Sequence, residues 1–322
     1  MAYVPARWLP GPHVMTVFAR LARGPRGLTP VRERWELDDG DFLDVDRHGD
    51  PDAPTVVVLH GLESSSRAPY VLRLAAAAAA EGLSTLAVNF RGCSGETNRL
   101  PRTYHSGETS DLARVVERLA AERPGRPIGL AGFSLGGNVV AKWLGERGDD
   151  LPTEVAAAAV ISVPFDLARC AASIDGGRGM GTIYRERFLR TLRQKAIAKA
   201  RRFPDLPFDS EQVRACRTFA EFDERVTARL HGFADATDYW TRSSAGRYLS
   251  GVRRPLFAIA AKDDPIVPGD TLPHGEAERN GCVRLEVYRA GGHVGFVAGP
   301  PWRFEFFAEA RAAAFLGAAL RR

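Results

Sequence analysis

The sequence predicts an α/β protein, with a mostly parallel central sheet, helices on both faces and a helical insertion. Short apolar runs rich in β-branched residues alternate with helical stretches along most of the chain. A run that is apolar at every position is typical of a strand buried on both faces. The alternation stops between about residues 165 and 251, where the sequence is charged, aromatic and helical in pattern. We therefore expect residues 1–322 to form one domain, with a helical cap inserted at about residues 165–251.

The elements follow one another in an order that suits such a fold. A β-hairpin comes first, at residues 32–49, and turns at Asp39-Gly40. The apolar strands that follow lie at residues 54–61, 84–92, 127–134, 154–165, 255–264 and 283–290. The predicted helices lie at residues 68–82, 110–125, 135–148 and 303–322. Ser110 is expected to be the N-cap of the second of these helices.

Composition narrows the class of protein. Hydrophobic residues make up 45% of the chain and charged residues 26%, as in an ordinary globular protein. The formal net charge is +5 and the basic residues form no block, so a nucleic-acid partner is not expected. A mildly basic surface does suit peripheral contact with an anionic membrane. Nothing in the sequence indicates an oligomeric state.

Cysteine spacing and the N-terminal segment bear on location. The four cysteines lie far apart and form no CxxC pair, so neither a metal site nor a disulfide framework is expected. Residues 1–24 contain no continuous apolar stretch of the kind found in signal peptides. The apolar run at residues 74–80 is too short to span a bilayer. These features predict a cytoplasmic protein that needs neither a metal nor a cofactor.

One glycine-rich stretch, "GLAGFSLGGN" at residues 129–138, carries the strongest chemical signal. Gly132, Ser134 and Gly136 match the pattern G-x-S-x-G between a predicted strand and a predicted helix. In that context the serine occupies a sharp turn at the carboxyl end of the sheet and acts as a nucleophile. The stretch lacks the lysine of a phosphate-binding loop and the G-x-G-x-x-G spacing of a dinucleotide site.

A serine nucleophile needs an acid and a base, which in such folds follow it on loops after later strands. Three histidines come after the serine, namely His231, His274 and His293. His293 is the candidate base because it directly follows the last predicted strand, within "RAGGHVGF". The loop "AKDDP" offers Asp263 and Asp264 as the acid, and its D-x-x-x-P layout favours Asp264.

Two backbone N–H groups are needed to stabilise the oxyanion that forms in acyl transfer. One is expected from Leu135, directly after the nucleophile. The other is expected from Leu62, which follows the strand that ends at His60-Gly61. His60 is expected to shape this loop by hydrogen bonding and not to act as the base.

Longer motifs run in the same order along the chain, from about residue 60 to residue 297: "HGLESSSRAPY", "FRGCSGETNR", "YHSGETSD", "GFSLGGN", "FDERVTARLHGFADATDYW", "AKDDP" and "GGHVGF". In this combination the chain resembles the YheT-type α/β-hydrolases, whose animal relatives include membrane-associated acylglycerol lipases. The resemblance implies the α/β-hydrolase fold, esterase activity and a triad of Ser134, Asp264 and His293. The letters "ESSS" after Leu62 depart from the glycine that is more common in relatives, which bears on the geometry of the oxyanion hole.

These residues predict a serine carboxylic ester hydrolase that works through an acyl-enzyme on a small ester with a hydrophobic acyl group. The alternatives are a ligand-binding receptor or an inactive relative on the same fold, a thioesterase and a peptidase. Dehalogenase and epoxide-hydrolase chemistry is disfavoured, because those enzymes use a carboxylate nucleophile where this chain has a serine.

The inserted segment, residues 165–251, contains a strongly basic helical stretch at residues 184–202. Its apolar face, at positions 184, 188, 192 and 196, is expected to pack on the core, although a face that docks on anionic lipid has the same pattern. Cys93, in the loop after the second apolar strand, is expected to pack and not to react. The polar residues expected to hold the inserted segment against the core are His231, Asp235, Asp238 and Tyr239.

Overall fold

The computed structural model describes residues 3–25 and 27–321. The strands of its main sheet are β1 (Val31–Glu36), β2 (Phe42–His48), β3 (Thr55–Leu59), β4 (Ser84–Val88), β5 (Ile128–Phe133), β6 (Val155–Ile161), β7 (Leu256–Ala261) and β8 (Val283–Tyr288). The helices are α1 (Pro12–Leu21), α2 (Pro69–Ala80), α3 (Ser110–Glu122), α4 (Leu135–Arg147), α5 (Leu167–Gly176), α6 (Met180–Arg202), α7 (Ser210–Ala215), α8 (Phe219–Phe222), α9 (Ala228–His231), α10 (Ala236–Ser243), α11 (His274–Arg279) and α12 (Phe307–Leu320). A second, small sheet pairs β9 (Val297–Ala298) with β10 (Glu305–Phe306).

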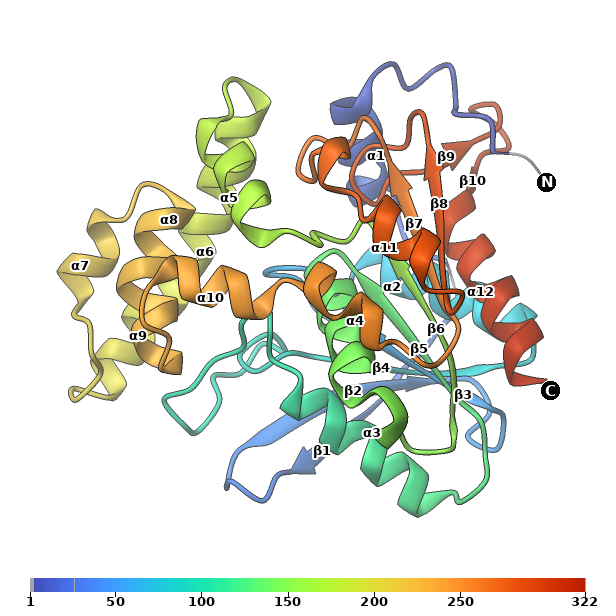
Figure 1. The fold of residues 1–322 in the computed structure, drawn as a ribbon, viewed down its shortest axis with the longest axis horizontal. Coiled ribbons are helices and arrows are strands. Elements are labelled where there is room, and N and C mark those ends of the chain that lie inside the picture. Colours follow the sequence, from blue (N-terminus) through green and yellow to red (C-terminus); the bar gives the residue numbers. More distant parts are fainter. Residues whose placement is uncertain (1–2, 26, 322) are drawn as a thin grey trace.

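The main sheet places its strands side by side in the order β1-β2-β4-β3-β5-β6-β7-β8 (Figure 1). From β4 to β8 neighbouring strands are parallel, whereas β1 and β2 form an antiparallel hairpin that adds to β4. The loops that follow β3, β5, β7 and β8 therefore emerge at one edge of the sheet, where open α/β sheets bind their ligands. The predicted mostly parallel sheet is confirmed.

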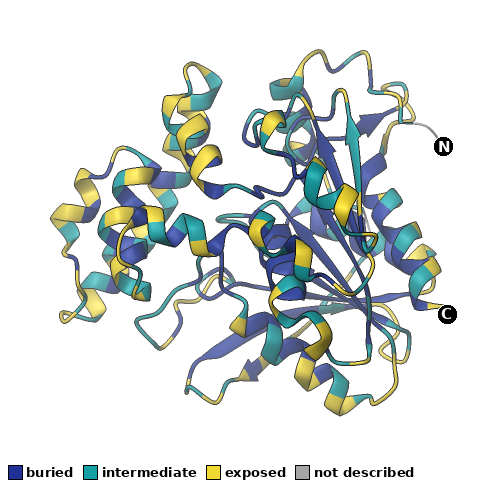
Figure 2. Ribbon diagram, in the orientation of Figure 1, coloured by how far each residue is buried: buried dark blue, intermediate teal, exposed yellow. Residues whose placement is uncertain are grey.

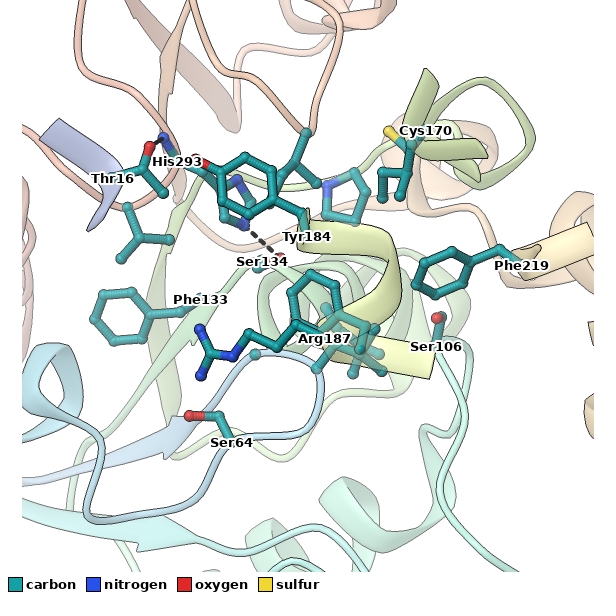
Figure 3. Close-up of a pocket in the computed structure, with 18 of the residues that line it drawn as sticks. Thr16, Ser64, Ser106, Phe133, Ser134, Cys170, Tyr184, Arg187, Phe219 and His293 are labelled. Carbon is teal, nitrogen blue, oxygen red and sulfur yellow. Dashed lines mark hydrogen bonds between the residues drawn. The ribbon is translucent and has the colours of Figure 1, made fainter. Parts of the chain in front are cut away.

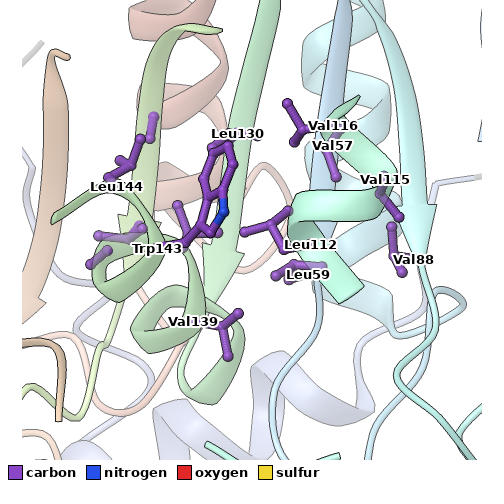
Figure 4. Packing of buried hydrophobic residues seen from close by; sticks show 14 of the residues in the cluster. Val57, Leu59, Val88, Leu112, Val115, Val116, Leu130, Val139, Trp143 and Leu144 are labelled. Atoms are coloured by element: carbon purple, nitrogen blue, oxygen red, sulfur yellow. The ribbon is translucent and has the colours of Figure 1, made fainter. Parts of the chain in front are cut away.

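Helices cover both faces of this sheet. α2 and α12 pack over one face, and α3 and α4 over the other (Figure 1). Successive side chains of a strand point to opposite faces. In β3, Val56 and Val58 therefore join a first hydrophobic cluster, with α2 and α12, whereas Val57 and Leu59 join a second cluster, with α3 and α4. In the second cluster Trp143 of α4 lies among leucine and valine side chains of α3 and the sheet (Figure 4). Strands β3 to β7 are buried almost throughout (Figure 2), which explains their mostly apolar sequences, whereas β1 and β8 at the two edges of the sheet are partly exposed.

The inserted segment runs between β6 and β7. In the described part of the chain it contains α5 to α10 and no strand, and it lies beside the sheet, on the side away from α12 (Figure 1). It has an apolar cluster of its own, which includes Leu189, Val213 and Phe222. A short π-helical turn, Asp223–Thr227, joins α8 to α9.

Of the four side chains expected to hold the inserted segment against the core, two reach the loop after β4. His231 Nε2 lies 3.1 Å from Thr103 Oγ1, and the hydroxyl oxygen of Tyr239 accepts a hydrogen bond from the backbone N–H of Ser106 at 3.0 Å. The other two candidates act locally: Asp235 is the N-cap of α10, and Asp238 pairs with an arginine one turn along the same helix. Two of the four side chains expected to hold the inserted segment against the core therefore do so.

Three details differ from the predictions. Ser110 is the first residue of α3 and not its N-cap, because its hydroxyl donates to the carboxylate of Glu108; Thr109 takes the cap position without a side-chain bond. α12 begins at Phe307 and not at residue 303, because Glu305–Phe306 pairs with β9. The sequence pattern also does not predict α1, which packs beside α2.

The described residues contain neither a membrane-spanning helix nor a cluster of metal-binding side chains. Among residues 3–25 and 27–321, no helix has both the length and the apolar character needed to cross a membrane. In the same residues, no group of three or more His, Cys, Asp or Glu side chains is placed to bind a metal ion.

Candidate active site

Ser134 lies in the sharp turn between β5 and α4. Its backbone φ is 51°, a left-handed value that is costly for any residue with a side chain. The turn forms only because two glycines let three chain segments approach closely: a Cβ on Gly132 would lie 2.5 Å from the carbonyl oxygen of Gly136, and a Cβ on Gly136 would lie 2.5 Å from that of Leu59. The backbone thus places the serine side chain at the carboxyl edge of the sheet.

A continuous chain of hydrogen bonds runs from Ser134 through His293 to Asp264. Ser134 Oγ lies 2.9 Å from His293 Nε2 (Figure 3). On the other side of the imidazole, His293 Nδ1 lies 2.8 Å from Asp264 Oδ2 and 3.1 Å from its Oδ1. Both the imidazole and the carboxylate are largely buried, with side chains 11% and 2% exposed. The carboxylate accepts from Nδ1–H, so Nε2 is the nitrogen left to accept a proton from the serine hydroxyl.

The two neighbouring aspartates of the loop after β7 have different contacts. Besides His293, Asp264 accepts hydrogen bonds from the backbone N–H groups of Ile266 and Val267, at 2.8 and 3.0 Å. Asp263 instead accepts from the N–H groups of residues 291 and 292, at 2.8 and 3.0 Å. Asp264 therefore orients the imidazole, and Asp263 holds the backbone turn that precedes it.

Leu62 lies on the loop after β3, between two residues whose backbone N–H groups are already hydrogen-bonded. The N–H of Gly61 donates to the hydroxyl of Tyr70 at 3.0 Å, and the N–H of Glu63 donates to the hydroxyl of Tyr104 at 2.9 Å. Within the described part of the chain, the N–H of Leu62 itself has no hydrogen-bond acceptor. The N–H of Leu62 is therefore available to a bound substrate, whereas those of Gly61 and Glu63 are not.

Leu135 supplies the second available backbone N–H group. It is the first residue of α4, where N–H groups have no acceptor within the helix, and no other described residue accepts from it. The positive end of the helix dipole also favours negative charge at this point. Both residues expected to form the oxyanion hole therefore lie beside Ser134 with their N–H groups available.

His60 is buried beneath this loop and uses both ring nitrogens. Its Nδ1 lies 2.7 Å from the carbonyl oxygen of Gly61, and its Nε2 accepts from the N–H of Phe90 at 3.2 Å. Burial lowers the pKa of His60 to about 4, so the ring is neutral with its proton on Nδ1. His60 therefore connects the loops after β3 and β4, as expected, and does not contact Ser134.

Thr16 of α1 is a site residue that sequence reasoning missed. Its Oγ1 accepts a hydrogen bond from the backbone N–H of His293 at 2.9 Å and donates to the carbonyl oxygen of Pro12 at 2.7 Å (Figure 3). The next N–H of the loop, that of Val294, donates to Ser162 Oγ at 3.0 Å. The histidine loop is thus held from two sides by hydroxyl groups. Thr16 falls within "WLPGPHVMT", but no local pattern connects it to a residue so far along the chain.

Two cavities meet at this site. Cavity 1 has a volume of about 220 Å³ and is lined by Ser134, His293 and apolar side chains of α1, α5 and α6. Cavity 2 has a volume of about 290 Å³ and lies between the inserted segment and the loop after β4. The residues that line both are Leu62, Ser106, Leu135, Phe219, Asp223 and Tyr239.

The apolar face predicted for the basic helix is directed inward. Phe188 of α6 lines cavity 1, whereas Leu192 and Ala196 line cavity 2. Tyr184 also lines cavity 1 (Figure 3), and it packs against Ile266 in the loop after β7. This face therefore forms walls of the two cavities as well as packing on the core. Contact with an anionic membrane stays a prediction.

Cys93 is not suited to act as a nucleophile. Burial raises the pKa of its thiol to about 11, and its sulfur lies 3.2 Å from Lys195 Nζ within an apolar cluster. The thiolate, which is the reactive form, is therefore disfavoured. This agrees with the expectation that the residue packs and does not react.

Comparison with known proteins places the chain in a family. A family model described as the alpha/beta hydrolase fold matches residues 54–300. The chain is 37% identical over 314 residues to "Putative esterase YheT" of Escherichia coli (strain K12), with 96% of this chain and 91% of that protein covered. It is 33% identical to "Phospholipase ABHD3" of Mus musculus, where the match covers 76% of this chain and 59% of that protein.

A solved structure supports the same fold. The esterase Pf2001 of Pyrococcus furiosus is similar to this chain with a TM-score of 0.58 and 20% sequence identity, covering 94% of this chain and 97% of that one. At this identity the similarity concerns the fold alone. The chain belongs to the α/β-hydrolase fold family, and within it to the YheT-type group that its sequence motifs indicate.

Proposed function

We propose that the protein is a serine carboxylic ester hydrolase with Ser134, Asp264 and His293 as its catalytic triad. One observation carries the proposal: Ser134 stands in a strained turn, hydrogen-bonded to an imidazole that a buried carboxylate orients. Two free N–H groups lie beside it, on Leu62 and Leu135. A nucleophile, a base, an acid and oxyanion donors in one place are the parts that acyl transfer requires.

The proposed reaction has two steps. Ser134 Oγ attacks the ester carbonyl carbon while its proton passes to His293 Nε2, and the N–H groups of Leu62 and Leu135 stabilise the oxyanion. The carbon–oxygen bond to the alcohol then breaks, and the alcohol leaves with the proton from His293. Water attacks the acyl-enzyme with the same histidine as base, which releases the acid and restores the serine.

We further propose that residues 165–251 act as a cap within a single domain and that the substrate has apolar parts. The apolar lining that α5 and α6 contribute to cavity 1 supports this. The named relatives, an esterase and a phospholipase, support ester hydrolysis over the receptor alternative. Thioesters and activated amides are the remaining alternatives for the same triad.

Covalent labelling and turnover test the proposal together. Wild-type protein should hydrolyse p-nitrophenyl hexanoate and bind a fluorophosphonate probe at Ser134, and Ser134→Ala should lose labelling and at least ~10⁴-fold in kcat. Ser106→Ala is a matched control, because that serine also lines cavity 1 but its hydroxyl contacts no part of the triad; it should still be labelled. A wild-type protein that neither labels nor turns over any ester, with its fold intact by circular dichroism, would favour the receptor alternative.

A further inference from the structure

The two cavities receive different parts of an ester, and the position of His293 decides which. This step rests on the proposed function. An ester carbonyl bound by the N–H groups of Leu62 and Leu135 sits where the cavities meet, because both residues line both cavities. The departing alcohol oxygen must take its proton from His293 Nε2, and His293 lines cavity 1 but not cavity 2. The alcohol part therefore occupies cavity 1, and the acyl part occupies cavity 2.

The lining of cavity 2 combines apolar and cationic side chains with the carboxyl groups of Glu63 and Asp223. Apolar side chains of the inserted segment line it, among them Leu192, Phe222 and Leu230. The four cationic side chains of its lining are Arg91, Arg102, Lys195 and Lys199. An acyl chain that enters from the junction thus meets positive charge as it extends.

Three of these four cations are already paired with carboxylates. Arg91 contacts the carboxylates of three aspartates, at positions 39, 41 and 111. Arg102 pairs with Glu108 at 2.5 Å. Lys195 Nζ lies 3.0 Å from Glu63 Oε1. Glu63 also lines the cavity, and this ion pair neutralises its charge.

Lys199 is different, because no carboxylate of the described residues lies within ion-pair distance of it. Its side chain is buried, with the residue 4% exposed, and Nζ donates to two carbonyl oxygens only, those of Asn98 at 3.0 Å and of Leu100. A lysine ammonium has three donors, so one remains unspent. Burial and the nearby Arg202 and Arg91 lower the pKa of Lys199 to about 8, although Asp41 opposes this. A bound anion would stabilise the charged form.

We propose that cavity 2 binds an acyl chain whose far end carries a carboxylate, held by the ammonium of Lys199. The substrates are then half-esters of dicarboxylic acids. The neutral ester carbonyl lies at the junction, and an apolar methylene chain lies along the α6–α8 side. The free carboxylate meets Lys199, the cation of the described lining that has no carboxylate partner. Hydrolysis releases the dicarboxylic acid from cavity 2 and the alcohol from cavity 1.

A matched pair of esters tests this directly. Mono-p-nitrophenyl adipate and p-nitrophenyl hexanoate have the same acyl length and leaving group and differ in a terminal carboxylate against a methyl group. A charge-assisted hydrogen bond predicts a kcat/KM for the adipate half-ester at least about tenfold higher than that for hexanoate in the wild-type protein. Lys199→Met should bring this ratio to about one. Lys199→Gln, which keeps an N–H donor for the two carbonyl oxygens, should do the same and serves if the methionine variant fails to fold.

Arg187→Met is the matched control. Arg187 lines cavity 1 (Figure 3) and, like Lys199, forms no ion pair with any described residue, so this variant should keep the wild-type ratio. A ratio near one in the wild type, a ratio that survives loss of Lys199, or a ratio that Arg187→Met abolishes would each overturn the proposal. Hexanoate turnover that depends on Ser134 but shows no adipate preference would leave the ester hydrolase function standing and end only this inference.

Discussion

Two buried carboxylates, one in a loop of the central sheet and one in the inserted segment, are held in different ways. In the loop after β7, Asp264 receives two backbone N–H groups and an imidazole. In the inserted segment, Asp223 is buried with two side-chain donors only: Trp240 Nε1 at 2.8 Å and Thr227 Oγ1 at 2.8 Å. Backbone donors are fixed by the fold, whereas side-chain donors depend on rotamers. The backbone therefore helps to fix the position of Asp264, whereas the position of Asp223 depends on neighbouring side chains.

Electrostatics sharpen this contrast. Burial raises the pKa of Asp223 to about 6, and no cationic side chain of the described residues pairs with it. Asp223 also lines both cavities. A change in its charge would therefore act on both the packing of the inserted segment and the shared wall of the two cavities.

The largest expected effect falls on the sheet side. Asp264→Asn should lower kcat by roughly 10³- to 10⁴-fold, because an amide in place of the carboxylate no longer fixes the reactive tautomer of His293 or stabilises its charged form. The matched variant is Asp263→Asn, whose amide oxygen can still accept from the turn at residues 291–292, so it should lose less than about tenfold. Steady-state kinetics of both variants on p-nitrophenyl hexanoate provide the measurement. Equal losses, or a larger loss at Asp263, would show that the neighbouring aspartate is the acid.

A smaller effect, on stability, is expected in the inserted segment. The carboxyl of Asp223 has an ordinary pKa of 3.8 when exposed and about 6 when buried here. Between these values the folded protein binds this proton more tightly than the unfolded chain does. The contribution of Asp223 to the free energy of unfolding should therefore fall as pH rises from about 4 to about 6, by on the order of 2–3 kcal/mol in total.

Asp223→Asn isolates that contribution. The amide is nearly the same size, its oxygen can accept from Trp240, and its NH₂ group can donate to the hydroxyl of Thr227. The free energy of unfolding of the variant minus that of the wild type should rise over the same pH range, as measured by urea unfolding at several pH values. A difference that does not change with pH would mean that the pKa of Asp223 is not raised in the folded protein.

The same contrast explains what the sequence could predict. Strands β3 to β7 are buried on both faces, so nearly every position is apolar and the pattern is visible without any partner; the polar exceptions are Thr55, Ser84 and Thr85, at the starts of β3 and β4. The order of Ser134, Asp264 and His293 follows from the strands that precede them, because parallel strands bring their following loops to one edge of the sheet. The inserted segment could be recognised as helical, but its contacts could not be derived, because they depend on how short helices pack against each other.

Long-range contacts of single side chains account for most of what was missed. Thr16 contacts a histidine loop 277 residues further along the chain, and no periodicity encodes such a pair. Ser110 was expected at a helix cap from its type alone, but a neighbouring carboxylate competes for its hydroxyl. Cavity 2 is formed by two segments about a hundred residues apart, so its cations could be counted but not paired from sequence.

The smallest expected effect is at Thr16, and it tests whether the N-terminal helix α1 also helps to hold the loop of His293 in place. Thr16→Val keeps the shape of the side chain but leaves the backbone N–H of His293 without its acceptor, which costs about 1–3 kcal/mol for a buried group and loosens the loop. We expect kcat to fall roughly tenfold with KM almost unchanged, because displacement of the base affects the transition state more than binding. Thr16→Ser, which restores the hydroxyl, should recover most of the activity in the same assay. If the valine variant instead raises KM at constant kcat, or if serine does not rescue it, then α1 acts as part of the cavity wall and not as a support for the base.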